Sequence, residues 1–260
     1  MKKIIVVPLM LLCSLLLVSC SHKSEDARST AKKDWPTSEI TPTLKLAQSV
    51  MTPSILHQLG NPNLVFDHGS FVVNNNSNDL DVSKEFELDA QTQLDVNGRP
   101  AIGKAVLTKT TRLNKKSDQN NEGEVPYGWS QKSNLKGYWT RAYDKGALIE
   151  EQLVGGFKKF DASPSNFSNV ITQTAWANEA YEKDSKGQQY YENMIREAQD
   201  SGMRIRYQVK ELYEGNNLVP SGTEIEAVDQ EYSLKLHVFI PNVQPNIKID
   251  YKTGNVIEVR

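Results

Sequence analysis

Residues 143–153 read YDKGALIEEQL and are followed directly by VGGFKKF at 154–160. An acidic residue, a basic residue and a glycine precede an apolar run, which is typical of a strand that carries polar side chains to a site before the chain turns. Position 147, where a catalytic side chain would be expected, is alanine. The segment therefore predicts an active-site strand from which the reactive group is missing.

The rest of the chain predicts the fold around this segment. Ala, Glu, Gln, Lys and Arg dominate residues 175–200, which predicts a helical block broken only near Gly187. Segments with alternating or Thr- and Val-rich composition on both sides predict strands. These strands are expected at 101–111, 204–213, 223–232, 234–243 and, as a closing hairpin, 247–259. We therefore expect an α+β fold with a mainly antiparallel sheet and flanking helices.

The N-terminus has the layout of a secretory signal. Two lysines precede an apolar run at 4–18, which is short for a membrane span and ends in the lipobox pattern LVSC at 17–20. We expect residues 1–20 to be a lipoprotein signal peptide and Cys20 to carry the lipid. An ordinary signal peptide that contains a cysteine is the alternative. The lipid would hold the protein on the outer, extracytoplasmic side of the cell membrane.

Composition divides the chain after the signal into two parts. Residues 21–45 are rich in Ser, Thr, Lys, Asp and Glu, which predicts a solvated tether. Residues 46–260 are expected to form one domain. Cys13 would be removed with the signal and Cys20 would be lipidated, so the domain has no cysteine for a disulfide and must depend on its core.

Charge gives little indication of a partner. The formal net charge is −2, so nucleic-acid binding would require a local basic patch. The four histidines disfavour a multi-histidine metal site. A basic strip and a set of scattered, solvated cations are both compatible with the pattern. The cations concerned are Lys132, Lys136, Arg141, Lys145, Lys158, Lys159 and Arg196.

Six segments, taken together and in order, resemble the DNA/RNA non-specific endonuclease family, and DNA-entry and secreted nucleases of Gram-positive bacteria in particular. They are LDVNGRPAIGKA (94–105), YDKGALI (143–149), NVITQTAWANEA (169–180), YYENMIREA (190–198), YQVKELYEGNNLVPSG (207–222) and FIPNVQPNIKIDYKTG (239–254). The resemblance covers about residues 60–260. It implies a ββα-metal site that uses one divalent ion, usually Mg²⁺, to hydrolyse phosphodiester bonds of DNA or RNA.

The resemblance also shows what the alanine replaces. The family motif reads Asp-Arg-Gly-His, and its histidine is the general base; the matching residues here are Asp144, Lys145, Gly146 and Ala147. Alanine has no proton acceptor, and general-base catalysis typically contributes about 10²–10⁴-fold. Lys145 keeps the positive charge of the family's arginine but loses its bidentate recognition of phosphate.

The metal side of the site has matching residues. The resemblance assigns a site asparagine to Asn169, the metal-holding asparagine to Asn178, the glutamate that fixes the metal's waters to Glu192, and the phosphate contact to Arg196. Glu192 and Arg196 are four residues apart, so on a helix they project from one face. The alternative is an exposed helical ion pair with Asn178 as an ordinary surface residue.

Three functions remain open at this point. The domain is a membrane-tethered, Mg²⁺-dependent nuclease, or a pseudonuclease that binds metal or nucleic acid without cutting, or a nuclease deliberately inactivated at Ala147. The second change, at Lys145, disfavours deliberate inactivation. Glu150 and Glu151 are expected to repel a polyanion, and His68 or His237 could replace the base only by an accident of the fold. We therefore expect cleavage to be lost or severely impaired.

Overall fold

The computed structural model describes residues 35–82, 89–114 and 123–259. Pro36–Arg260 forms one compact unit. Within the described residues no helix is both long and apolar enough to cross a bilayer. The predicted signal peptide and Cys20 lie outside the described residues, so they remain predictions.

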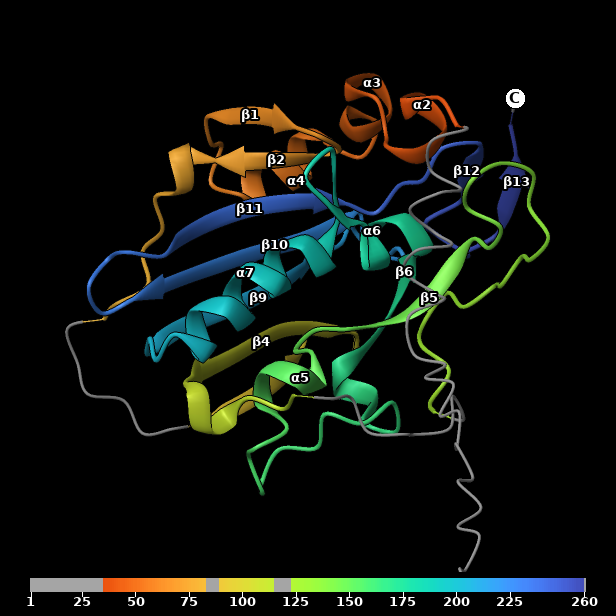
Figure 1. The fold of residues 1–260 in the computed structure, drawn as a ribbon. Coiled ribbons are helices and arrows are strands. Elements are labelled where there is room, and N and C mark those ends of the chain that lie inside the picture. The colour runs from red at the N-terminus through yellow and green to blue at the C-terminus, as the bar shows by residue number, and fades with distance from the viewer. Residues whose placement is uncertain (1–34, 83–88, 115–122, 260) are drawn as a thin grey trace, which may run out of the picture. The chain divides into compact units, whose positions relative to one another are not determined.

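A seven-stranded antiparallel sheet forms the centre of the unit, which confirms the predicted fold class (Figure 1). Its strand order is β1-β2-β11-β10-β9-β4-β3. The strands are β1 (Leu64–Asp67), β2 (Ser70–Val73), β3 (Ala90–Leu94), β4 (Pro100–Leu107), β9 (Ile205–Leu212), β10 (Gly222–Asp229) and β11 (Lys235–Pro241). The predicted closing hairpin is also present, as β12 (Ile247–Ile249) paired with β13 (Val256–Glu258).

A second layer, which carries the polar segment, lies in front of the sheet in Figure 1. It contains a separate two-stranded ribbon and three helices. These elements are β5 (Tyr143–Ala147), β6 (Val170–Thr174), α5 (Glu151–Val154), α6 (Ala175–Glu179) and α7 (Gln188–Asp200). Short 3-10 turns lie beside them or beside the sheet: η1 (Asn74–Asn76), η2 (Lys109–Thr111) and η3 (Phe167–Asn169).

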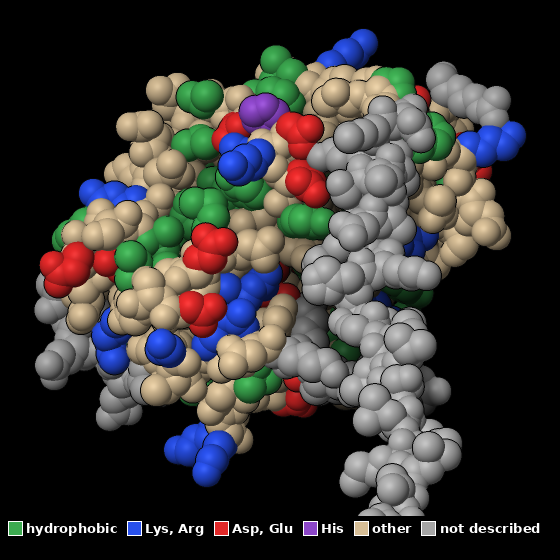
Figure 2. All heavy atoms as spheres, in the orientation of Figure 1, with side chains coloured by type: hydrophobic (Ala, Val, Ile, Leu, Met, Phe, Trp, Pro, Cys, Tyr) green, Lys and Arg blue, Asp and Glu red, His purple; other side chains and the backbone are tan. Residues whose placement is uncertain are grey.

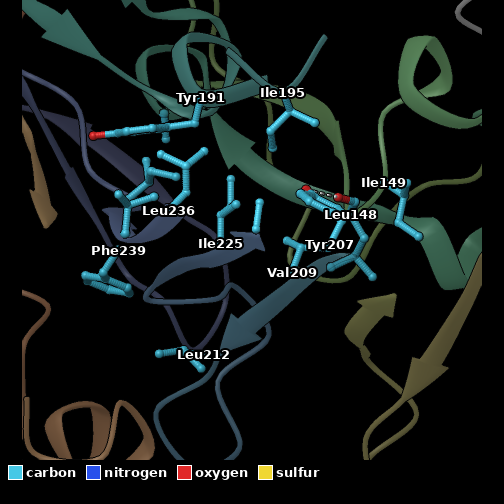
Figure 3. Packing of buried hydrophobic residues seen from close by; sticks show 14 of the residues in the cluster. Leu148, Ile149, Tyr191, Ile195, Tyr207, Val209, Leu212, Ile225, Leu236 and Phe239 are labelled. Carbon is cyan, nitrogen blue, oxygen red and sulfur yellow. Dashed lines mark hydrogen bonds between the residues drawn. The ribbon is translucent and has the colours of Figure 1, made fainter. Parts of the chain in front are cut away.

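The core lies between this layer and the sheet. Tyr191 and Ile195 of α7 face Ile225 of β10 and Val209 of β9, and all four side chains are buried (Figure 3). Strand side chains alternate between the two faces, so every second residue of these central strands points toward α7. Burying an aliphatic side chain of this kind contributes about 1.5–3 kcal/mol. The packing fixes α7, and with it the polar residues that α7 carries.

The predicted helical block is interrupted for longer than its composition indicates. Between α6 and α7 the chain forms a small hairpin, β7 (Tyr181–Glu182) and β8 (Ser185–Lys186). Gly187 then precedes α7 as its N-cap, and a Cβ atom there would lie 2.7 Å from the backbone oxygen of Trp176. Tertiary packing of α7 against α6, which helix propensity does not report, therefore sets the break.

The folded unit begins earlier than the predicted boundary at residue 46. The short helix α2 (Thr37–Ile40) lies in the segment predicted as tether, and α3 (Leu44–Gln48) and α4 (Pro53–Gln58) follow. Ile40 is buried, and Trp139 donates a hydrogen bond from Nε1 to its backbone oxygen at 2.8 Å. The polar composition of this segment concealed these few buried residues.

Asn169 holds the chain in place where β5 ends. Its side chain accepts a hydrogen bond from the Ile149 N–H at 2.9 Å and donates one to the Ile149 oxygen at 3.0 Å. Its backbone oxygen also accepts from the Leu148 N–H at 2.9 Å. All three residues are fully buried. Because buried backbone groups need partners, this amide determines the path of the chain from β5 into α5.

The opposite face of the sheet carries a buried charged cluster. His237 lies 2.7 Å from Glu224 through Nε2 and 2.6 Å from the Ser77 carbonyl through Nδ1, so the imidazolium form donates to both. Burial alone lowers the pKa of His237, but these contacts raise it above its ordinary value of 6.5. Burial raises the pKa of Glu224, whereas its contacts with His237 and Lys210 bring it below 4.5.

We predict that the ion pair between His237 and Glu224 makes stability depend on pH. Because the pKa of His237 is raised in the folded state, the ion pair contributes fully to stability below pH 6.5. This contribution is lost as the pH rises through the folded-state pKa of His237. The pKa of Glu224 is lowered, so its contribution to stability is lost as the pH falls from 4.5 through the folded-state pKa of Glu224. Urea denaturation should show stability declining above pH 6.5, and less so in His237→Gln. The exposed His57→Gln is the matched control; an equal decline in all three proteins would contradict the prediction.

We also predict that Asn169 contributes strongly to stability. Asn169→Ala leaves two buried backbone groups of Ile149 without partners, which should lower the free energy of unfolding by at least about 2 kcal/mol. Urea denaturation measures this loss. The control is Asn216→Ala at an exposed position, which should change stability by less than about 0.5 kcal/mol. A loss at Asn169 no larger than the control's would show that the amide is not needed.

Candidate metal and phosphate site

The ribbon of β5 and β6 brings the predicted site residues together. The strands pair antiparallel, with Tyr143 opposite Thr174 and Ala147 opposite Val170. Thr174 then caps α6 by accepting from the Ala177 N–H at 3.1 Å. One end of the ribbon therefore leads into α6, and Ala147 at the other end lies beside the start of α7, where its backbone oxygen accepts from Gln188 Nε2.

A cavity of about 160 Å³ lies at this junction. It is lined by Lys145, Ala147, Glu150, Asn178, Glu179, Gln188, Gln189 and Glu192. Four of these residues were expected in the site from the sequence: Lys145, Ala147, Asn178 and Glu192. The lining contains three carboxylates and one ammonium group, and two of the carboxylates, Glu150 and Glu179, are paired with arginines outside the lining.

Asp144 supports the site from beside the cavity. Its Oδ2 accepts a hydrogen bond from Asn178 Nδ2 at 3.1 Å, and its Oδ1 lies 2.6 Å from Arg141 Nε. Arg141 also contacts Glu179. Burial alone lowers the pKa of Arg141, but these two carboxylates raise it. Because the amide nitrogen of Asn178 is held by Asp144, its carbonyl oxygen is the atom left to act as a ligand.

Glu192 is held by a glutamine that the sequence analysis did not identify. Gln188 Nε2 donates to Glu192 Oε1 at 2.8 Å and to the backbone oxygen of Ala147 at 2.9 Å. Gln188 Oε1 in turn accepts from Gln173 Nε2 at 2.9 Å. The spacing of Gln188 and Glu192, four residues apart on α7, was a usable signal. Gln188 therefore joins the carboxylate of Glu192 to the strand that carries Ala147.

Arg196 has a partner that differs from both sequence-based alternatives. It forms an ion pair with Glu150, and its other nitrogen contacts Asn193. The side chains of Arg196 and Glu150 are 9% and 8% exposed. An exposed pair between Glu192 and Arg196 is therefore absent, and Glu150 does not stand as an unpaired acid beside the groove.

The remaining predicted residues lie away from the cavity. Asn169 is buried at the end of β5 and orients the backbone. His237 is occupied by Glu224, and His68 lies on the turn between β1 and β2 with Nδ1 2.7 Å from Asp67. Neither histidine lines the cavity, and no other histidine among the described residues does.

Three of the seven cations that could form a basic strip are paired with carboxylates. Lys132 pairs with Glu258, Arg141 with Asp144 and Glu179, and Arg196 with Glu150. Lys145 Nζ donates to the Gly123 oxygen at 2.8 Å. On the face seen in Figure 2, Lys and Arg side chains are interspersed with Asp and Glu side chains. The structure therefore favours the scattered cations over a continuous strip.

The donors at the cavity suit a hard divalent ion. Asn178 and Glu192 supply amide and carboxylate oxygens, which Mg²⁺ prefers, and Mg²⁺ usually keeps several waters with few protein ligands. The described residues contain no group of three or more His, Cys, Asp or Glu side chains that could hold a metal. The residues present therefore fit a largely hydrated Mg²⁺ and do not fit a closed, transition-metal type of site.

Comparisons with known proteins identify the family. The family model for DNA/RNA non-specific endonucleases matches residues 68–256. NucA from Streptococcus agalactiae, with magnesium ion bound and with no metal bound, is 35% identical, with TM-scores of 0.74 and 0.73. Each comparison covers 82% of this chain and 100% of that chain.

The likeness to a third solved structure shows a similar fold and no more. The Sda1 nuclease with bound zinc ion is 18% identical, with a TM-score of 0.50 over 66% of this chain and 82% of that chain. The family match and the NucA structures confirm the resemblance that the six sequence segments indicate. This chain belongs to the DNA/RNA non-specific endonuclease family.

Proposed function

We propose that this protein is a membrane-anchored lipoprotein with the metal-binding half of an endonuclease site and without its water-activating half. The observation that carries the proposal is that Ala147 lines the same cavity as Asn178 and Glu192. The side chain at the family's general-base position faces the proposed metal ligands and has nothing with which to accept a proton. Cleavage of DNA or RNA is therefore severely impaired.

Asn178 and Glu192 would hold the Mg²⁺ ion, consistent with the magnesium-bound NucA structure. The ion would supply positive charge that stabilises the charge developing on a phosphodiester. Neighbouring side chains would orient Asn178 and Glu192 for the ion. Asp144 orients the amide of Asn178, and Gln188 holds the carboxylate of Glu192.

A second candidate function is binding of nucleic acid without cleavage. Lys145, which lines the cavity, favours it, whereas the ion pairs of Arg141 and Arg196 limit the positive charge available to phosphates. Binding of DNA by the unaltered protein that weakens as salt is added would support this candidate, because contacts with phosphates release counterions.

We predict that a histidine restores cleavage. Ala147→His supplies a proton acceptor in the cavity, and plasmid DNA with Mg²⁺ should be cut at least about 10²-fold faster than by the unaltered protein. Purified protein from residue 21 onward, assayed by agarose gel over time, gives the measurement.

Two controls accompany the histidine variant. Ala147→Gln adds bulk and polarity without a base and should stay at the unaltered rate. Glu192→Gln combined with Ala147→His should lose the restored activity, because the proposed metal site is weakened. Robust cutting by the unaltered protein would contradict the impairment, and failure of Ala147→His would show that the site lacks more than its base.

We predict that Cys20 anchors the protein. Its expression in a bacterial host should yield a membrane fraction labelled by radioactive palmitate, and Cys20→Ala should abolish the label and release the protein from that fraction. Cys13→Ala is the matched control, because Cys13 would be removed with the signal. Equal labelling of Cys20→Ala and the unaltered protein would disprove the lipid anchor.

A further inference from the structure

We propose that Glu150 keeps Arg196 from binding nucleic acid. Arg196, the residue at the family's phosphate-contacting position, forms an ion pair with Glu150 instead. The inference rests on the proposed function, because the phosphate role of Arg196 comes from the family's site. It adds a second defect to the site, independent of Ala147. Glu150 thereby limits how tightly the domain holds a phosphodiester.

The first support is geometric. Glu150 Oε2 contacts Arg196 Nη1, and both side chains are less than a tenth exposed. Glu150 also lines the cavity shared by Ala147 and Glu192. The carboxylate therefore lies at the site and takes up a guanidinium nitrogen that would otherwise contact a phosphate oxygen.

The second support is the fixed backbone on both sides of Glu150. Ile149, the preceding residue, is bound through its N–H and its oxygen by Asn169. The backbone oxygen of Glu150 accepts a hydrogen bond from the Leu153 N–H at 3.0 Å, in the first turn of α5. Because the backbone is held, the carboxylate can leave Arg196 only by a change of the Glu150 side-chain rotamer.

The third support is electrostatic. Burial, followed by the charges of Glu192, Glu150 and Glu211, raises the pKa of the Tyr207 hydroxyl, so these carboxylates act on one buried region. A phosphate that approached Arg196 would therefore meet Glu150 and Glu192 as well. Like charges placed together in a desolvated site oppose binding, so Arg196 can contact a phosphate only after Glu150 is displaced or neutralised.

The test removes the charge of Glu150 and keeps its shape. Glu150→Gln retains an oxygen that can accept from Arg196, and binding of a fluorescently labelled DNA duplex is followed by anisotropy in EDTA at several salt concentrations. EDTA prevents cleavage and separates this result from the metal site. Affinity should rise about tenfold, which corresponds to one recovered charge-assisted hydrogen-bond contact. The logarithmic salt dependence should steepen by about 0.9, the value for one added phosphate.

The matched control is Glu151→Gln. It removes the neighbouring carboxylate, which does not line the cavity, and should change affinity by less than about twofold. Equal effects of the two single variants, or no gain in Glu150→Gln, would overturn the proposal.

A double variant keeps the test decisive if Glu150→Gln does not fold, since breaking a buried pair is costly. Glu150→Gln with Arg196→Gln replaces both charges by neutral groups of similar size, and its affinity should equal that of the unaltered protein. A clear fall would show that Arg196 already binds DNA and would overturn the proposal. A Mg²⁺-induced rise in melting temperature, measured on the unaltered protein, reports the metal site separately, so failure of the proposed function is distinguishable.

Discussion

The hydrogen bonds between the amide of Asn169 and the backbone of Ile149 are the contact on which the site depends. The chain leaves β5 inside the protein, where neither the strand ladder nor water satisfies these peptide groups. A side-chain amide, which both donates and accepts, satisfies them from η3, the turn that precedes β6. These hydrogen bonds place residue 147 beside α7 and Glu150 against Arg196. Asn169 therefore determines which side chains line the cavity.

Arginine and acidic side chains around the cavity form ion pairs with one another. Arg141 joins Asp144 and Glu179, and Arg196 joins Glu150, so most of the positive charge near the ribbon is already compensated. The same ion pairs compensate Glu150 and Glu179, so Glu192 and Lys145 are the charged lining residues outside these two groups.

Local pattern predicted the sheet and the closing hairpin, because period-two alternation is a property of short segments. Only the family resemblance indicated that Asn178 and Glu192, which line one cavity, belong together. Local pattern did not predict that Glu150 pairs with Arg196, since the two residues are 46 positions apart and meet only after β5, α5 and α7 pack. The folded role of residues 36–45 was hidden for a similar reason. A few buried contacts, such as that of Trp139 with Ile40, outweigh a polar composition.

The contact between Gln188 and residue 147 uses the backbone oxygen and not the side chain. The link between β5 and α7 is therefore indifferent to which amino acid occupies position 147. A chain that exchanged histidine for alanine there would keep its ligand framework and lose no hydrogen bond of that link. Selection for stability alone places little restraint on this position, and only selection for cleavage would preserve a base. The link between β5 and α7 and the chemistry at position 147 are therefore under separate constraints.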